Sequence, residues 1–168
     1  AEAERAGQFY VDRRWLGGML TNFKTVRKSI ERFKELLDQV GDEQKVAEIS
    51  KKELSGINRW IEKYKKSLDG IKEMTRLPDA LFVIDVGCEA IAIKEANRLG
   101  IPIVGVVDSN CDPDSIDYVV PGNDDSLRAI QLYCTRVAEA CIEGAMLFSE
   151  RVQAEVAEEE RTRATGPA

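Results

Sequence analysis

The amino-acid sequence predicts an α/β fold, in which a parallel sheet carries helices on both faces and an antiparallel helical hairpin is inserted into the chain. Two observations predict it. Between residues 77 and 149, apolar runs of strand length alternate with helical patterns, and such units form parallel sheets. Between residues 22 and 76, two apolar stripes of helical spacing are joined by a short break, which favours a helical hairpin. The 168 residues suffice for one such domain and an appendage.

The first 21 residues are assigned to the α/β domain together with residues 77–149. Residues 1–7 have the pattern of the last turns of a helix that Gly7 closes, and residues 8–11 that of a short strand. Because this helix has no visible start, we expect further chain upstream.

The insertion at residues 22–76 is predicted to be a coiled coil of two antiparallel helices. Gly41 and Asp42 break the first helix, and Ser50 with Glu53 forms a capping box for the second. The flanking positions are too charged to bury a wide face, so we expect the two narrow seams to pack on each other. The alternative is two surface helices lying flat on a core. The seams consist of Val26, Ile30, Phe33, Leu37 and Val40, and of Leu54, Ile57, Ile61, Tyr64, Leu68 and Ile71.

Three apolar runs supply the predicted sheet. The first two run on without polar interruption and end in an aspartate, as buried parallel strands do. A helix that Gly100 stops lies between them, and a long helix follows the PGNDDS loop. The strands are residues 81–85, 101–108 and 118–120, and the helix between the first two is residues 89–99.

Charge is distributed unevenly along the chain. The net charge is −6, with 43% apolar and 32% charged residues, which is ordinary for a folded protein. Residues 1–76 contain 17 Lys and Arg against 13 Asp and Glu, a net of +4, and the remainder contains 7 against 17, a net of −10. Residues 150–168 form an acidic tail that we expect to be disordered. A protein this polarised can place one face on phosphate and another against solvent or protein.

The basic stretch predicts RNA binding. Between residues 13 and 34 there are seven basic residues and one acid. Two adjacent guanidinium groups suit phosphate, and the tryptophan beside them suits stacking on an unpaired base. Along the hairpin, basic residues recur at spacings of four and seven, which gives each helix a charged stripe. The alternative is an ordinary solvated face. The predicted RNA-binding residues are Arg13, Arg14, Trp15, Lys24, Arg27, Lys28, Arg32, Lys52 and Arg59.

Several kinds of catalytic or cofactor site are excluded by residue type and spacing. The chain has no histidine, and its four cysteines have no CxxC spacing, which excludes a zinc finger and a Cys–His nucleophile. The P-loop and GxGxxG patterns of nucleotide-binding proteins are absent from the sequence. No apolar run approaches the roughly 20 residues of a membrane span. We therefore predict a cytosolic protein that is not an enzyme and requires no cofactor.

Aspartates collect where the predicted strands end. Asp85 and Asp108 close two parallel strands, and Asp124 lies in a loop at the same edge. Converging carboxylates repel one another unless a cation lies among them, and hard cations prefer oxygen ligands. A divalent-cation pocket at Asp108 and Asp124 is therefore one hypothesis. The alternative is that Asn123 and its neighbours cap the long helix while Asp112 shapes a turn.

Three long segments resemble one known family. They are FYVDRRWLGGMLTNFKTVRKSI, GIKEMTRLPDALFVIDVGCEAIAIKEANRLGIPIVGVVDSN and DYVVPGNDDSLRAI. In this order they are similar to bacterial-type small-subunit ribosomal protein two, over about residues 1–148. The strings RWLGGMLTN and PGNDD are especially specific. Members of that family carry a further N-terminal segment, with additional strands and RNA contacts, so the resemblance also leads us to expect chain upstream.

The resemblance implies a flavodoxin-like parallel sheet with an inserted coiled-coil hairpin. It implies a structural constituent of the small ribosomal subunit, located in the cytoplasm on the ribosome and without catalytic activity. The implied partners are small-subunit rRNA and neighbouring ribosomal proteins, including the large mRNA-binding first protein of that subunit. The alternative is a flavodoxin-like nucleotide-binding enzyme or sensor that uses the sheet edge at Asp85 and Asp108, and the missing glycine motifs argue against it.

Overall fold

A computed structural model describes residues 1–164, apart from the side chains of residues 43, 44, 48 and 157–164. The chain divides into two compact units. One comprises residues 1–8 together with the chain from Gln131 onward, and the other is Phe9–Ile130. Within the part of the chain that the structure describes, no helix combines the length and the apolar character that a membrane span needs.

The unit Phe9–Ile130 contains a parallel sheet. Within these residues the strand order is β1-β2-β3, and Leu81 of β1 lies beside Ile103 of β2 while Val104 of β2 lies beside Tyr118 of β3. The strands fall inside or overlap the apolar runs that predicted them, which confirms the α/β class. They are β1 Leu81–Val83, β2 Ile103–Val107 and β3 Tyr118–Pro121.

Helix α5, Ala90–Leu99, follows β1 and leads to β2. It ends at Gly100, whose φ of 69° lies in the left-handed region that glycine adopts without a steric penalty. The sheet, α5 and adjoining loops share one apolar core, which consists of Leu20, Val83, Val86, Ile93, Ala96, Ile101, Ile103 and Ile116.

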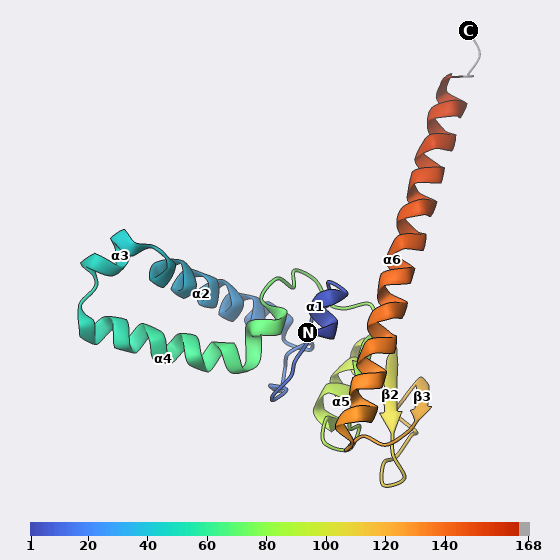
Figure 1. The fold of residues 1–168 in the computed structure, drawn as a ribbon, viewed down its shortest axis with the longest axis horizontal. Coiled ribbons are helices and arrows are strands. Elements are labelled where there is room, and N and C mark those ends of the chain that lie inside the picture. Colours follow the sequence, from blue (N-terminus) through green and yellow to red (C-terminus); the bar gives the residue numbers. More distant parts are fainter. Residues whose placement is uncertain (165–168) are drawn as a thin grey trace. The chain divides into compact units, whose positions relative to one another are not determined.

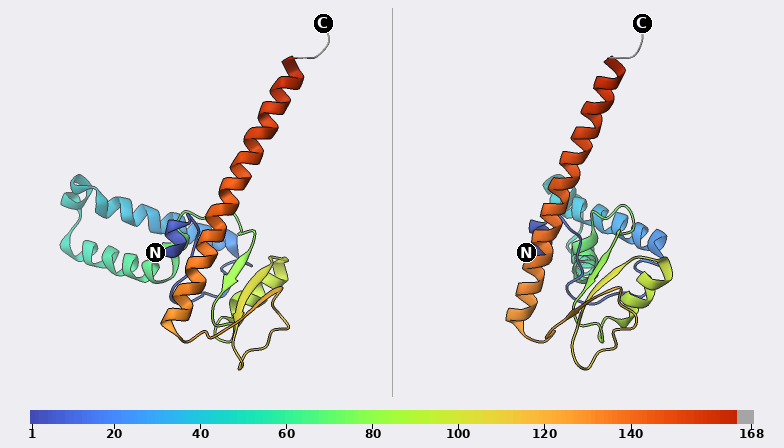
Figure 2. Two further views of the ribbon diagram at one scale, coloured as in Figure 1. Left: turned by 45° about the vertical axis from the view of Figure 1, so that its right-hand side comes forward. Right: turned by 90° about the vertical axis from the view of Figure 1, so that its right-hand side faces the viewer.

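Two long antiparallel helices form a hairpin within the same unit. Figures 1 and 2 show α2 and α4 side by side, with the short α3 at the turn. The break after Gly41 and the capping box of Ser50 with Glu53 occur where the sequence predicted them, whereas α3 was not predicted. The elements are α2 Phe23–Gly41, α3 Glu43–Glu48, α4 Lys51–Leu68 and the 3-10 turn η1 Asp69–Ile71.

The hairpin has an apolar core of its own. Phe33 is completely buried on α2, and its ring centroid lies 5.8 Å from that of Tyr64 on α4. The two helices therefore pack on each other along their apolar seams. A flavodoxin-like connectivity, helices on both faces of the sheet and supercoiling of the hairpin stay predictions. The hairpin core consists of Met19, Ile30, Phe33, Leu36, Ile61, Leu68, Ile71 and Met74.

The other unit consists mainly of helix. Helix α1, Glu2–Arg5, ends before Gly7, which has the left-handed φ of 64° expected of a closing glycine. Helix α6, Leu127–Ala164, contributes its residues from Gln131 onward to this unit. The prediction of disorder from residue 150 is wrong as far as Ala164, because Glu, Ala and Arg are strong helix formers that favour continuing an existing helix. Residues 165–168 of the predicted tail lie outside the described residues.

The predicted strand at residues 8–11 does not form. The backbone N–H of Tyr10 donates to the carbonyl of Gly70 at 3.1 Å, but Gly70 belongs to the 3-10 turn η1. A strand requires a neighbouring extended segment to complete its ladder. Here the partner of Tyr10 is a helical turn, so no ladder forms although the local sequence pattern favours a strand.

Candidate nucleic-acid interface

Arg13 and Arg14 lie on the segment that leads into the hairpin. Both side chains are exposed, and neither makes a hydrogen bond or an ion pair with any residue that the structure describes. Two adjacent guanidinium groups without an internal partner are available to pair with phosphate oxygens. Both belong to the basic stretch from which RNA binding was predicted.

The next residues, 15–21, form a loop that we call the root loop, and it is bound to one buried carboxylate. Glu95 on α5 is only 7% exposed. Its Oε1 accepts from Gly18 N at 2.6 Å and from Trp15 Nε1 at 3.3 Å. Its Oε2 accepts from Leu20 N and Thr21 N, both at 2.9 Å, and from the Thr21 hydroxyl at 3.0 Å. Five donors thus surround one side chain.

These hydrogen bonds keep Glu95 ionised. Burial by itself raises the pKa of Glu95, but the bonds from Thr21, Gly18, Leu20 and Trp15 outweigh it and lower the pKa to about 2. The negative charge of Glu95 is therefore stabilised by N–H and O–H dipoles of the root loop, and the arginines beside the loop stay free.

Trp15 has an internal role that the sequence did not predict. Its ring is half-buried and packs against both the hairpin core and the sheet core, and its N–H is donated to Glu95. Stacking of Trp15 on an RNA base stays a prediction, and it would have to use whatever part of the ring these contacts leave accessible.

The predicted basic stripe on α2 is exposed along its length. Arg27 pairs with Glu31 at 3.7 Å and Arg32 pairs with Glu35 at 2.9 Å. Such surface ion pairs contribute little free energy and exchange readily for a phosphate. Lys24 and Lys28 have no ion-pair partner among the described residues, so the first two turns of α2 carry cations that are free.

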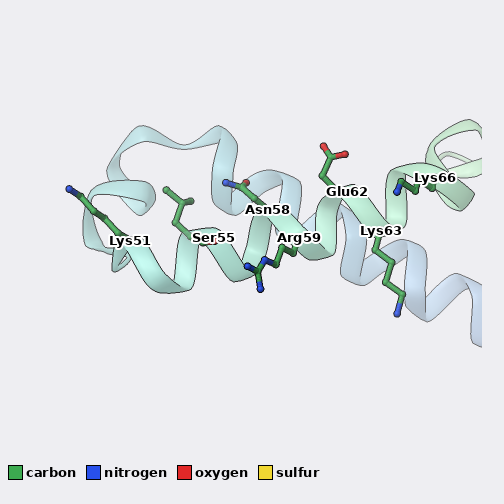
Figure 3. A pocket seen from close by; sticks show the side chains of 8 residues that line it. Lys51, Ser55, Asn58, Arg59, Glu62, Lys63 and Lys66 are labelled. Atoms are coloured by element: carbon green, nitrogen blue, oxygen red, sulfur yellow. The ribbon is translucent and has the colours of Figure 1, made fainter.

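A shallow groove of about 620 Å³ runs along α4 and is predominantly basic. Figure 3 shows Arg59 and Lys63 projecting from the same side of the helix and Glu62 from the other. The groove includes the predicted Arg59 but not the predicted Lys52, which is exposed elsewhere on α4. Its lining residues are Lys51, Leu54, Ser55, Asn58, Arg59, Glu62, Lys63 and Lys66.

An exposed aromatic residue adjoins this groove. Trp60 is 51% exposed, and Lys63 Nζ lies 4.8 Å from the centre of its ring. A cation above an aromatic face is held there by the ring quadrupole. Trp60 is thus the aromatic group on the hairpin that is available for stacking on a base, a role that the sequence analysis had given to Trp15.

The acidic sheet edge has a different character. Asp124 is 8% exposed, and its pKa is raised by burial first and then by the negative charges of Asp85 and Asp108. The pKa of Asp108 is lowered, chiefly because its carboxylate accepts from Ser109 N at 2.6 Å. Asp85 has a φ of 62°, uncommon for a residue with a side chain, and accepts from Cys88 N at 3.0 Å.

This edge does not assemble a set of metal ligands in the described residues, where no three Asp, Glu, Cys or His side chains converge suitably. The turn-forming alternative is supported instead. Asn123 Oδ1 accepts from Asp125 N and Ser126 N just before α6, and Asp112 Oδ1 accepts from Asp114 N. Pairing of Asp108 and Asp124 around a divalent cation stays a prediction.

Comparison with known proteins settles the family. The family model described as ribosomal protein S2 matches residues 1–144. The chain belongs to the ribosomal protein S2 family. This confirms the resemblance read from the three sequence segments, and it makes the nucleotide-binding alternative at Asp85 and Asp108 unsupported, because the family is one of ribosomal proteins and not of enzymes.

Individual members of the S2 family are closely similar to this chain. Small ribosomal subunit protein uS2 of Hahella chejuensis is 57% identical over 143 residues, which are 85% of this chain and 56% of that protein. The uS2 protein of Marinobacter nauticus is 58% identical over 142 residues, 84% of this chain and 56% of the relative. The uS2 protein of Acinetobacter baylyi is 52% identical over 164 residues, which are 98% of this chain and 66% of the relative. The chain thus spans little more than half the length of the first two.

Sequence reasoning missed Trp60, Lys51 and Lys63 on α4, and it missed Glu95, which lies buried behind the root loop. Glu95 carried a signal that was overlooked, since it lies on the inner face of α5 between the buried Ala92 and Ala96. An acid on a buried face requires internal partners. Lys51 and Lys63 gave no signal beyond the general charge of α4.

Proposed function

We propose that this chain is a structural constituent of the small ribosomal subunit that binds small-subunit rRNA through Arg13, Arg14 and the basic faces of α2 and α4. The observation that carries the proposal is the pair of exposed arginines without internal partners, next to a loop that five hydrogen bonds fix in place. The names of the relatives, small ribosomal subunit protein uS2, support it.

The opposite net charges of the two halves of the chain support different binding partners for each half. Residues 1–76 have a net charge of +4 and the remainder −10. RNA repels an acidic surface, so the acidic half turns toward proteins or solvent. We therefore propose that neighbouring ribosomal proteins, including the large mRNA-binding first protein of the subunit, contact this half, and that the chain is located in the cytoplasm on the ribosome.

Two finer features of the fold belong to this proposal. The sheet is flavodoxin-like, and α2 with α4 is a coiled coil that serves as a stiff, basic arm. Separate apolar cores in the hairpin and the sheet support this arrangement, because an arm with its own core keeps its shape when it contacts RNA.

Salt dependence of RNA affinity tests the proposal. Small-subunit rRNA transcribed in vitro is titrated with the 168-residue chain over a range of salt concentrations. The logarithm of affinity falls by roughly 0.7–0.9 per logarithm of salt for each phosphate neutralised. The double variant Arg13→Ala/Arg14→Ala is expected to bind more weakly and to lower this slope by about two phosphate contacts.

The matched control is Arg128→Ala/Arg151→Ala, which removes the same charge from exposed positions on α6. It is expected to retain nearly the wild-type slope. An affinity that does not change with salt, or equal losses in the two double variants, would refute binding through the predicted arginines.

A further inference from the structure

We propose that Glu95 is a positioning residue for RNA binding: it fixes the root loop so that Arg13, Arg14 and the first turn of α2 face one RNA surface together. This inference rests on the proposed function, since it concerns the same basic surface. Glu95 is buried on α5, with 7% of its surface exposed, so it acts through the loop.

The root loop has the form of an anion-binding nest that is filled from within. The N–H groups of Gly18, Leu20 and Thr21 all point to the Glu95 carboxylate, at 2.6 to 2.9 Å. Gly18 has a φ of 90°, which a residue with a side chain rarely adopts. Successive backbone donors turned to one side create a concave anion site. In this protein the carboxylate of Glu95 occupies the anion site of the root loop. Its hydrogen bonds fix the backbone of the loop.

Both ends of the root loop carry the cations that the proposal requires. Trp15 directly follows Arg14, and Thr21 directly precedes Asn22, the residue before the first turn of α2. Glu95 accepts hydrogen bonds from Trp15 at one end and Thr21 at the other. One carboxylate therefore ties together the two ends of the loop, one next to Arg14 and the other shortly before Lys24.

The loop is also the joint between the hairpin and the sheet. Met19 is completely buried in the hairpin core, and Leu20, the next residue, is buried in the sheet core. Trp15 packs against both cores. Because Glu95 belongs to α5, its hydrogen bonds tie the start of the hairpin to the body that carries the sheet, which fixes the direction in which α2 leaves that body.

Glu95 organises the loop without pairing with the cations of the interface. No arginine or lysine among the described residues forms an ion pair with it. The residue type matters, because a glutamine has one acceptor oxygen and its amide group would direct N–H donors at the N–H groups of the loop. The substitution Glu95→Gln therefore removes the clamp while keeping the volume.

A double-mutant cycle separates positioning from simple stability. Binding of in vitro transcribed small-subunit rRNA is measured across salt concentrations, at a temperature where circular dichroism shows each variant to be folded. Glu95→Gln is expected to weaken binding about tenfold and to lower the salt slope by about two phosphate contacts. Adding Arg13→Ala/Arg14→Ala to Glu95→Gln is then expected to change affinity by less than about twofold, because the arginines already fail to engage.

Milder variants keep the test available if Glu95→Gln does not fold. Thr21→Val and Trp15→Phe each remove a single side-chain donor to Glu95 and retain the backbone donors. Each is expected to lower affinity and salt slope in the same direction by a smaller amount. Glu89→Gln, at the start of the same helix, removes the same charge away from the root loop and is expected to preserve the slope.

The outcomes distinguish this inference from the proposed function. One outcome would overturn the positioning role alone: the affinity of the wild type depends on salt, but affinity and salt slope are unchanged in Glu95→Gln, Thr21→Val and Trp15→Phe. So would strict additivity of the Glu95 and arginine substitutions, which is what a merely structural role predicts. If the RNA affinity of the wild type does not change with salt concentration, the proposed function itself would be overturned.

Discussion

The backbone N–H of Leu20 donates a hydrogen bond of 2.9 Å to Glu95 Oε2, across 75 residues of sequence. Both residues are buried, so neither the N–H nor the carboxylate can exchange this bond for water without opening the fold. Hydrogen bonds to an ionised acceptor are about twice as strong as those between neutral groups. The joint between hairpin and sheet therefore depends on the charge of Glu95.

Lowering the pH should reduce the free energy of unfolding, because Glu95 becomes protonated. Because the pKa falls from an ordinary value of 4.5 to about 2 in the folded state, the ionised carboxylate stabilises the fold above pH 4.5. This contribution is lost as the pH falls toward 2, and the difference in pKa corresponds to about 3 kcal/mol. Urea unfolding between pH 6 and pH 2 measures it.

Comparison with Glu95→Gln isolates that residue from other carboxylates. The wild type is expected to be more stable than the variant at pH 6, and the gap is expected to narrow progressively as the pH falls below 4.5. A gap of constant size over the whole range would mean that Glu95 does not titrate with the lowered pKa.

Truncation of Phe33 should strongly destabilise the hairpin. Its side chain is completely buried between α2 and α4, so Phe33→Ala is expected to reduce the free energy of unfolding by about 3–5 kcal/mol. Phe148→Ala provides the matched control, because Phe148 is 70% exposed on α6, and about 0.5 kcal/mol or less is expected there. Similar losses in chemical denaturation for both variants would contradict the hairpin core.

The capping box at the start of α4 should contribute measurably. Ser50 Oγ accepts from Glu53 N at 3.3 Å, and Ser50 N donates to Glu53 Oε2 at 3.2 Å. Ser50→Ala is expected to cost about 1 kcal/mol of unfolding free energy. Ser55→Ala, at an exposed position inside the same helix, is expected to leave stability unchanged or to raise it slightly, because alanine has the higher helix propensity. An equal cost at the two serines would argue against the cap.

Two glycines should respond in opposite ways to alanine. A Cβ at Gly70 would collide with the carbonyl oxygen of Tyr10, which is backbone and cannot rotate away. Gly70→Ala is expected to destabilise by about 1–3 kcal/mol. A Cβ at Gly56 meets open space on α4, so Gly56→Ala is expected to stabilise by about 0.5–1 kcal/mol. Thermal unfolding of the two variants side by side shows whether the shifts have opposite signs.

Features coded by neighbouring residues were predictable from sequence. The break after Gly41, the capping box at Ser50 and the end of α5 at Gly100 each depend on residues within one or two helical turns. The parallel strands were predictable because each is a short apolar run bounded by turn residues.

Features that depend on residues far away in the sequence could not be predicted. Trp15 reads as an exposed aromatic beside two arginines, but its N–H partner is Glu95, 80 residues along the chain. The sequence pattern of residues 8–11 predicts a strand, but the backbone N–H of Tyr10 donates to the carbonyl of Gly70, which lies in a turn. Glu95 itself is an acid on the buried face of α5, and only the folded root loop supplies the donors that it needs.

Association with the small ribosomal subunit is the most direct test of the central claim. The 168-residue chain is mixed with small subunits that lack their own uS2, washed at physiological salt and sedimented through a sucrose gradient. We predict that the wild type sediments with the subunit and that Arg13→Ala/Arg14→Ala remains largely at the top of the gradient. Equal recovery of both chains in the subunit fraction, or of neither, would contradict RNA binding through these arginines.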